Sequence, residues 1–476
     1  MVFSSIEFLF LFLPLLLGLY RIVPRRFENA VLLLASLLFY TWSGGAFLLI
    51  LLASIGGDYF AGAWVARARE KGLERRVAVG VGVSVGVNLG LLACFKYANF
   101  IVEQLNGMAA SMGWGTIAWT TIGLPIGISF FTFQSMSYTL DLARGRAEHL
   151  RNPLDFALYV ALFPQLICGP IVRYHEISRQ IRKRRVRLAD ATEGAVRFVH
   201  GLVKKVVVAD AAGSLADSAF SVPGDQLNAG TAWLGVIAYT LQIYFDFSGY
   251  SDMAIGLGRL FGFTFPENFR RPYSAISITD FWRRWHMTLS SWLRDYLYIP
   301  LGGSRGGASA TYRNLVIVFL LCGLWHGANW TFVLWGAFHG ALLVIERLTG
   351  QRPTETASFV ALRRACVMLM VTLGWVIFRA DSVQHAVAIY AAMFSFSGFE
   401  LAPEVALART HRVALVTGLA ALVVLLPRSF VAGPQLAVQP GPLFSLVRVV
   451  WLGGGAVIAT TLIASGNFSP FLYFQF

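Results

Sequence analysis

The chain has 476 residues, of which 56% are hydrophobic and only 13% are charged, and its mean hydropathy is +0.62. A soluble core of this size cannot bury so much apolar surface, so the composition excludes a soluble globular protein and predicts a membrane protein. The net charge of +14 does not indicate a nucleic-acid partner, because Lys and Arg gather in short loops between apolar runs.

Apolar runs that predict membrane helices recur along the whole chain. Examples are residues 31–50, 77–95, 233–244, 315–343 and 413–426. We expect roughly eleven membrane segments, because each crossing of the hydrocarbon layer needs an apolar helix. The predicted fold class is an all-α integral membrane protein, built as a multi-helix bundle.

The chain is predicted to form a single membrane domain over residues 1–476, because it has no low-complexity linker and no sustained repeat. Its polar motifs concentrate in a core at 124–346, whereas the flanks 1–123 and 347–476 are more uniformly apolar. The flanks are interpreted as a scaffold and the core as the site. The four cysteines have no metal-ligand or redox spacing, so we predict no metal site.

Basic residues between the apolar runs predict the topology. Three arginines at 21–26 follow the first segment and five Lys or Arg residues at 67–76 follow the third, while the turn near 42–46 is uncharged. The positive-inside rule then places the N-terminus outside and these loops in the cytoplasm. The first segment, residues 6–20, is expected to be kept as a span. The six basic residues at 179–187 are interpreted as an anchor on anionic lipid headgroups, with donor binding as the alternative.

Two stretches in the core interrupt their apolar runs with Pro and Gly. They are LPIGISF at 124–130 and FPQLICGP at 163–170. Pro and Gly within a membrane helix indicate a kink or a break, which is tolerated where the backbone is buried in protein or lines a cavity. Irregular helix packing alone would explain either stretch equally well.

Two aspartates lie at the C-terminal end of the apolar run that begins at residue 233. Asp246 and Asp252 lie in YFDFSGYSD at 244–252. An ionised carboxylate is not stable in hydrocarbon, so both should face a wet interior or an arginine. The candidate partners are Arg283, Arg284 and Arg294, and a structural ion pair is favoured over direct chemistry.

Residues 279–298 are predicted to form one amphipathic helix, with Ser277 and Asp280 at its start. Trp282, Trp285 and other aromatic residues recur at helical intervals, which favours a seat at a membrane boundary. The helix would carry His286 toward a polar interior.

A second histidine, His326, follows an apolar approach at 315–324 and precedes Gly327 and Ala328. An ionisable side chain at membrane depth indicates a functional site. The small residues beside the imidazole would let another chain segment or a thin acyl substrate come close. The alternative is a structural histidine that donates to a nearby carbonyl. His339 is interpreted as structural.

With these motifs the chain resembles the membrane-bound O-acyltransferase (MBOAT) family, and most closely its bacterial alginate O-acetyltransferase branch. The resemblance covers roughly residues 1–350. It rests on MVFSS at 1–5, FKYANF at 95–100, LPIGISF at 124–130, YFDFSGYSDMAIG at 244–256, FWRRWH at 281–286, WLRDYLY at 292–298, LGG at 301–303 and GLWHGAN at 323–329.

The resemblance implies that His326 is the catalytic histidine and that His286 occupies the second signature position. It also implies a helical body around a central tunnel, with interfacial or re-entrant helices. The residues expected to support the tunnel or the site are Asp246, Asp252, Trp285, Arg294, Asp295, Trp325 and Asn329. His286 or Asn329 is the candidate donor to the developing oxyanion.

The implied activity is acetyl transfer from a cytoplasmic thioester, with acetyl-CoA as donor and no permanently bound cofactor. The acetyl group would cross the bacterial inner membrane to a periplasmic SGNH-type acetyltransferase partner, which modifies an exopolysaccharide such as alginate. Rival functions are D-alanyl transfer from a carrier protein to teichoic acid, a transporter or channel whose polar residues line a passage, and a structural scaffold.

Overall fold

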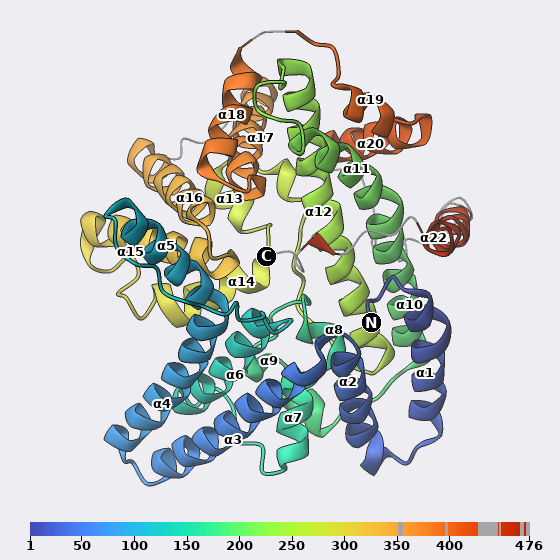
Figure 1. The fold of residues 1–476 in the computed structure, drawn as a ribbon. Helices are drawn as coiled ribbons and strands as arrows, with labels where there is room; N and C mark the ends of the chain where they lie inside the picture. Colours follow the sequence, from blue (N-terminus) through green and yellow to red (C-terminus); the bar gives the residue numbers. More distant parts are fainter. Residues whose placement is uncertain (351–355, 396–397, 427–445, 447–448, 467–470, 473–476) are drawn as a thin grey trace. The chain divides into compact units, whose positions relative to one another are not determined.

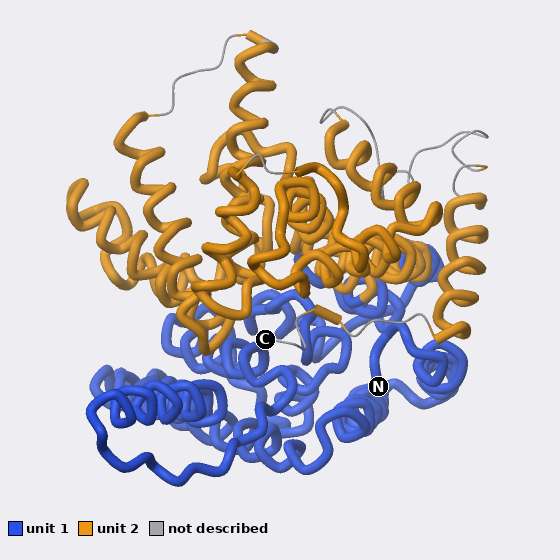
Figure 2. The backbone as a smooth tube through the Cα atoms, turned by 45° about the horizontal axis from the view of Figure 1, so that its top comes forward, with its two compact units in different colours: residues 1–194, 254–266 blue, residues 195–253, 267–476 orange. Residues whose placement is uncertain are grey.

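The computed structural model describes residues 1–350, 356–395, 398–426, 446, 449–466 and 471–472, and its regular structure over these residues is helical (Figure 1). The chain separates into two compact units (Figure 2). Unit 1 contains Met1–Gly194 and Ala254–Pro266, and unit 2 contains Ala195–Met253 and Glu267–Phe476. The two units are described separately below.

Unit 1 holds most of the N-terminal helices. They are α1 (Leu13–Ile22), α2 (Glu28–Gly44), α3 (Leu48–Glu70), α4 (Glu74–Leu92), α5 (Ala98–Ser111), α6 (Ile128–Ala143), α7 (Pro153–Ala161), α8 (Phe163–Leu166) and α9 (Tyr174–Arg182). The π-helical turns Glu7–Phe12 and Ala93–Tyr97 precede α1 and follow α4. Two long helices, α10 (Leu188–Val203) and α12 (Ala229–Leu260), contribute residues to both units.

Small and polar residues join α3, α4 and α6 in unit 1. Gly62 of α3 packs so closely on α6 that an added Cβ would lie 2.1 Å from Cε1 of Tyr138. The buried Asp58 of α3 accepts hydrogen bonds from Ser84 Oγ at 2.6 Å and Asn88 Nδ2 at 2.8 Å, both on α4. In a membrane, small residues allow helices to approach closely and polar side chains form hydrogen bonds between them. Both kinds of contact join α3 to its neighbours α4 and α6.

The two predicted interruptions of unit 1 are confirmed and they meet each other. Gly127, with φ of 76°, immediately precedes α6, and the short α8 ends at Leu166. A Cβ on Gly127 would lie 2.8 Å from the carbonyl oxygen of Leu166. Glycine is therefore required at position 127 for two reasons. Its backbone is left-handed, and the second interrupted segment packs too closely to leave room for a Cβ.

The interpretation of residues 179–187 as a headgroup anchor is wrong for Arg184. Its guanidinium is only 4% exposed, and it donates hydrogen bonds to Tyr20 Oη, to the Phe261 carbonyl and to Asn29 Oδ1. A buried guanidinium with several acceptors joins chain segments rather than binding lipid. Sequence spacing alone does not reveal these distant acceptors.

The remaining helices belong to unit 2. They are α11 (Asp210–Phe220), α13 (Ile278–Trp282), α14 (Met287–Leu293), α15 (Gly307–His326), α16 (Trp330–Thr349), α17 (Ala357–Arg379), α18 (Val383–Phe394), α19 (Pro403–Ala408), α20 (His411–Leu425) and α22 (Gly455–Ala464). A glycine pair joins α10 to α12, since a Cβ on Gly201 would lie 2.5 Å from the carbonyl oxygen of Gly249.

The prediction of one continuous helix over 279–298 is wrong. Ser277 does cap the start, accepting a hydrogen bond from the backbone N–H of Asp280 at 3.0 Å. The helix ends at Trp282, α14 begins at Met287, and His286 between them has a left-handed backbone. Periodic aromatic residues predicted the two helices but gave no signal for the break between them.

Five stretches of the described residues are long and apolar enough to span a membrane. They are Arg25–Glu70, Glu74–Ser111, Gly307–His326, Trp330–Thr349 and Ser358–Arg379. The first is interrupted at Gly45, which has a φ of 52°, so the apolar run at 31–50 belongs to two helices rather than one. The count of roughly eleven segments stays a prediction.

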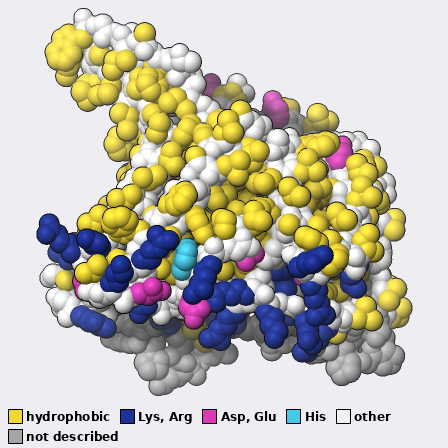
Figure 3. All heavy atoms as spheres, turned by 90° about the horizontal axis from the view of Figure 1, so that it is seen from below, with side chains coloured by type: hydrophobic (Ala, Val, Ile, Leu, Met, Phe, Trp, Pro, Cys, Tyr) yellow, Lys and Arg dark blue, Asp and Glu magenta, His cyan; other side chains and the backbone are white. Residues whose placement is uncertain are grey.

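Exposed apolar side chains cover much of the surface. Phe60 of α3 is 72% exposed and Leu415 of α20 is 63% exposed. Figure 3 shows hydrophobic side chains spread over the drawn face, with Lys and Arg gathered along one border of it. Lipid is the solvent that such a surface needs, because a soluble protein rarely exposes apolar patches of this extent.

Candidate functional site

His326 is the last residue of α15, at the point where the chain turns into α16. Gly327 is extended and ends α15, and Asn329 then caps α16 by accepting a hydrogen bond from the backbone N–H of Thr331 at 3.0 Å. The Asn329 amide also donates to the carbonyl of Asp381 at 2.9 Å. Asn329 therefore fixes the C-terminal side of the helix break that follows His326. Both the oxygen and the nitrogen of its side-chain amide are used in these hydrogen bonds.

Glycines bring α15 and α16 together behind His326. A Cβ on Gly323 would lie 2.2 Å from the carbonyl oxygen of Phe332, and one on Gly336 would lie 2.3 Å from that of Phe319. The space beside Gly327 is filled by the Phe332 ring, whose Cε2 would lie 2.0 Å from an added Cβ. The space beside Gly327 is therefore taken by a side chain of the same chain, and the prediction that it admits another chain or an acyl substrate is not supported.

Aromatic rings surround the imidazole of His326, which is 6% exposed. The ring centroids of Trp325, Trp335 and Phe378 lie 5.0, 5.2 and 5.1 Å from that of His326, each in an edge-to-face arrangement. Such a wall excludes bulk water and strengthens any electrostatic contact made inside it.

His286 is held in a strained backbone conformation. Its φ is 42°, and Arg271 is the only other described residue besides glycine with a positive φ. The left-handed region costs a residue with a Cβ about 1–2 kcal/mol. Strain of this kind persists where the surrounding structure enforces it and is concentrated at functional sites.

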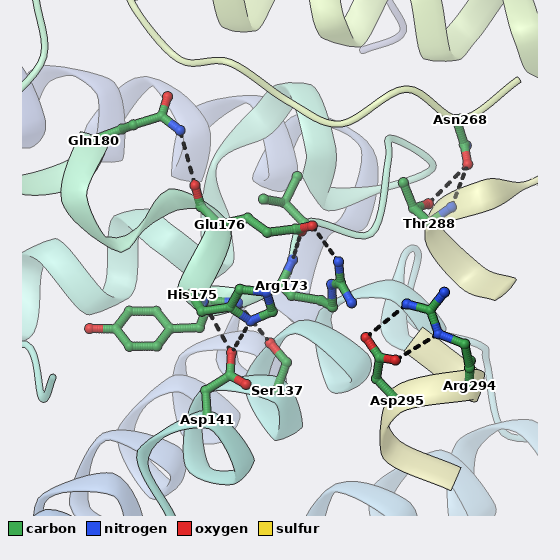
Figure 4. Close-up of polar contacts among 12 residues, drawn as sticks. Ser137, Asp141, Arg173, His175, Glu176, Gln180, Asn268, Thr288, Arg294 and Asp295 are labelled. Carbon is green, nitrogen blue, oxygen red and sulfur yellow. Dashed lines mark hydrogen bonds and ion pairs between the residues drawn. The ribbon is translucent and has the colours of Figure 1, made fainter. Parts of the chain in front are cut away.

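Asn268 fixes the orientation of the His286 ring. The Asn268 Oδ1 atom accepts hydrogen bonds from the Thr288 N–H and hydroxyl (Figure 4). The same oxygen lies 3.1 Å from His286 Nδ1. Asn268 Nδ2 donates to Ser251 Oγ at 3.1 Å, which identifies Oδ1 as the acceptor oxygen. His286 Nδ1 therefore carries the proton, and Nε2, for which the described residues offer no hydrogen-bond partner, presents a lone pair.

Both signature histidines belong to one set of ring contacts within unit 2. His286 contacts the Trp325 ring at 6.1 Å and the Phe247 ring at 4.7 Å, and Trp325 also contacts His326. We name the aromatic–histidine cluster by its members, which are Trp282, His286, Trp325, His326, Trp335, His339, Trp375 and Phe378. The sequence analysis named two of its histidines as site residues, interpreted His339 as structural and did not single out Trp335.

The predicted ion pairing of Asp252 is confirmed, but its predicted partners are wrong. Asp252 accepts hydrogen bonds from Arg197 at 2.8 Å and from Lys204 at 2.8 Å, and Arg197 also pairs with Glu267 at 2.5 Å. The three expected arginines lie elsewhere, with Arg284 paired to Asp280. These cations precede Asp252 by about fifty residues, so local spacing carried no signal.

Asp246 is paired in the same way with a lysine that the sequence did not suggest. Lys205 lies 3.3 Å from Asp246 and 2.5 Å from Asp210, and its side chain is 2% exposed. Asp246 also accepts the backbone N–H of Leu472 at 2.8 Å. We name the charged network by its members, which are Arg197, Lys204, Lys205, Asp210, Asp246, Asp252 and Glu267.

The other predicted supporting residues have structural surroundings. Trp285 is 2% exposed and packs on Phe269 and Trp375 at ring distances of 5.0 and 4.9 Å. Arg294 and Asp295 pair with each other at 2.8 Å, and the Arg294 side chain is 59% exposed (Figure 4). Neither member of this pair forms part of the aromatic–histidine cluster.

Unit 1 contains a polar cluster that sequence reasoning missed. The buried carboxylate of Asp141 lies 2.8 Å from Nδ1 of His175 and also accepts the backbone N–H of His175 at 3.0 Å (Figure 4). Arg173 and Glu176 pair beside it at 2.5 Å. His175 and Asp141 are thirty-four residues apart, and their spacing contains no recognisable motif.

Comparison with known proteins identifies the class to which this structure belongs. The model of the membrane-bound O-acyltransferase family, MBOAT, matches residues 91–384, and the chain belongs to this family. It is therefore an O-acyltransferase and a multi-pass membrane protein.

Individual relatives resemble this chain closely. A probable alginate O-acetylase AlgI of Pseudomonas syringae is 49% identical over 84% of this chain and 76% of its own length. Another, of Pseudomonas putida, is 44% identical over the whole of both chains. A peptidoglycan O-acetyltransferase of Helicobacter pylori is 36% identical over 84% of this chain and 81% of its own length.

Proposed function

We propose that this O-acyltransferase takes an acetyl group from cytoplasmic acetyl-CoA and passes it across the bacterial inner membrane for the O-acetylation of an exopolysaccharide, alginate. The full-length similarity to a probable alginate O-acetylase carries the choice of polymer. The buried imidazole of His326, which ends α15 at a helix break and is surrounded by aromatic rings, supports the chemistry.

In the proposed reaction, the neutral imidazole of His326 accepts the proton of an acceptor hydroxyl while the hydroxyl oxygen attacks the thioester carbonyl. The C–S bond then breaks, the new ester forms, and the imidazolium returns its proton to the leaving thiolate. General-base assistance of this kind supplies about 10²–10⁴-fold in rate. A dry, aromatic-walled site increases the electrostatic part of that effect.

The two candidate oxyanion donors receive different roles in this proposal. The Asn329 amide is committed to capping α16 and to the Asp381 carbonyl, so Asn329 is assigned to the scaffold. His286 is the remaining candidate, because its Nε2 has no hydrogen-bond partner among the described residues and is left for the reacting groups. Its fixed orientation through Asn268 limits the reorganisation needed during reaction.

The topology part of the proposal follows the positive-inside rule. The N-terminus lies in the periplasm, the donor enters from the cytoplasmic face through a tunnel, and the acetyl group leaves to a periplasmic SGNH-type acetyltransferase partner. Membrane lipid surrounds the apolar helices.

The test uses purified protein in nanodiscs with acetyl-labelled CoA, measuring CoA release and labelled product. The wild type is compared with His326→Gln and with His411→Ala, an exposed histidine that serves as the matched control. We expect His326→Gln to lose at least about 10²-fold in kcat while keeping its thermal midpoint. A folded His326→Gln variant with full activity would exclude this imidazole from the reaction.

The same preparation separates the rival functions. A D-alanyl transferase would use a D-alanyl carrier protein and not acetyl-CoA, and a channel or transporter would release an intact solute with no cleaved thioester. Reconstitution in sealed vesicles, with donor on one side and acceptor on the other, tests the passage across the membrane.

A further inference from the structure

His339 of α16 is a fully buried histidine for which the reaction above has no role. Its side chain has 0% exposure. Its ring centroid lies 5.0 Å from that of Trp282 and 5.0 Å from that of Trp335, both edge to face, and 5.3 Å from that of Phe338. Neither of its two ring nitrogens has a hydrogen-bond partner among the residues that the structure describes.

The two indoles against His339 share this condition. Nε1 of Trp282 and Nε1 of Trp335 are also buried with no acceptor in the described part of the chain, and the two indole ring centroids lie 5.6 Å apart. Trp375, also in the cluster, instead donates its N–H to Tyr273 Oη at 3.1 Å. Three mutually contacting rings thus present two donors and an imidazole that can both donate and accept.

An unpaired buried polar group destabilises a fold, whereas a phenyl ring of similar shape carries no such penalty. The protein nevertheless makes room for this imidazole, because a Cβ on Gly374 of α17 would lie only 2.8 Å from His339 Nε2. Polar groups at such positions are expected to serve a function or to bind internal water.

Trp335 connects this polar group to the proposed catalytic residue. Its ring contacts His339 at 5.0 Å and His326 at 5.2 Å, so one indole lies against both imidazoles. Whatever fixes the Trp335 indole therefore also fixes one wall of the His326 ring.

We propose that His339, Trp282 and Trp335 bind a buried water molecule, and that His339 is a positioning residue which acts through this water and Trp335 on His326. The water accepts from the indole N–H groups and donates to an imidazole nitrogen, which gives it the two to four partners typical of internal water. The activity part of this inference rests on the proposed function, whereas the water site does not.

The first test compares His339→Phe, which keeps ring packing and removes both nitrogens, with His339→Gln, which restores polar atoms. Phe338→Leu, at a neighbouring ring that also touches His339, controls for altered packing. We expect His339→Phe to lower kcat by about 10–100-fold with KM for acetyl-CoA within about twofold, since small misplacement of a catalytic group has effects of this size.

We further expect His339→Phe to keep or raise the thermal midpoint, because it removes unpaired polar atoms, and His339→Gln to recover most of kcat. Phe338→Leu should leave kcat near the wild-type value. A His339→Phe variant with wild-type kcat would overturn the positioning role, as would a loss of activity matched by a loss of folded protein.

The second test is an experimental structure of the wild type and of His339→Phe at a resolution that shows ordered water. We expect density within hydrogen-bonding distance of a His339 nitrogen and of at least one of the two indole nitrogens, and its loss in the variant. A dry cluster in the wild type would refute the water site. If the wild type transfers no acetyl group, the proposed function fails while this structural test still decides the water site.

Discussion

Two buried polar regions of unit 2 differ in how their polar groups are satisfied. Each charged group of the charged network has an ion-pair partner of opposite sign, such as Asp252 with Lys204. Among the described residues, the aromatic–histidine cluster instead leaves without a hydrogen-bond partner the Nε2 of His286, both nitrogens of His339 and the N–H groups of two indoles. Paired groups stabilise a fold, whereas unpaired polar atoms at this depth remain available to a substrate or to water. The comparison supports an architectural role for the first region and the proposed chemistry for the second.

Breaking the charged network should have the largest effect on stability. Asp252→Asn leaves the buried Lys204 without its acid, and removing one partner from such a pair typically costs about 3–5 kcal/mol. We expect a large fall in thermal midpoint in detergent, with the remaining folded protein retaining activity. Glu267→Gln is the matched control, since its side chain is 44% exposed and should contribute under about 1 kcal/mol. Equal losses in both variants would contradict the distinction.

Removing His286 should affect activity before stability. We expect His286→Ala and His286→Gly both to lower kcat/KM by about 10²-fold, because both delete the imidazole proposed to stabilise the oxyanion. The glycine variant should be the more stable by about 1 kcal/mol, since glycine adopts a φ of 42° without strain. Thermal unfolding and acetyl-CoA turnover measure the two effects separately. An active glycine variant would show that only the backbone shape matters.

Separating α15 from α16 should give an intermediate effect. Gly336→Ala places a Cβ 2.3 Å from the backbone oxygen of Phe319, and overpacking of this kind costs about 1–3 kcal/mol. Gly340→Ala, one turn further along, meets nothing closer than 3.4 Å and should be almost neutral. The thermal midpoints and kcat values of the two variants test whether the contact between α15 and α16 determines the geometry of the aromatic–histidine cluster. If Gly336→Ala had no effect, the two helices would be able to move apart enough to accept the added methyl group at little cost.

The smallest effect is expected at an ion pair outside both regions. The hydrogen bond and charge of Arg182 lower the pKa of Glu148, whose side chain is 83% exposed. A lowered pKa contributes stability above the ordinary glutamate pKa, and this contribution is lost as the pH falls through the lowered value. Solvent screens the pair, so Glu148→Gln should leave the thermal midpoint at pH 7 unchanged. A clear shift at pH 7 would mean that surface pairing matters here.

Much of the fold class was predictable because hydropathy and helix breakers act locally. Long apolar runs predicted membrane helices, and the Pro and Gly residues at 124–130 and 163–170 predicted interruptions that the structure contains. The prominence of His326 was also predictable, since an ionisable group follows an apolar helix.

The rest depended on contacts between residues distant in the chain. Arg197 and Lys204 reach Asp252 across more than forty residues, and Asn268 fixes His286 from a loop with no motif of its own. The break at His286 was missed because the aromatic spacing of both flanking helices fits one continuous helix. Burial of Arg184 was missed because its acceptors are Tyr20, Asn29 and a carbonyl far along the chain.

The glycine contacts between α15 and α16 also constrain how unit 2 moves. Gly323 lies against the Phe332 carbonyl and Gly336 against the Phe319 carbonyl, so a backbone carbonyl of each helix packs directly on a glycine of the other. A shift of register by one residue would bring a larger side chain onto a carbonyl oxygen. Sliding of this pair is therefore blocked, so any opening between these elements of unit 2 must come from side-chain rotation or from other helices.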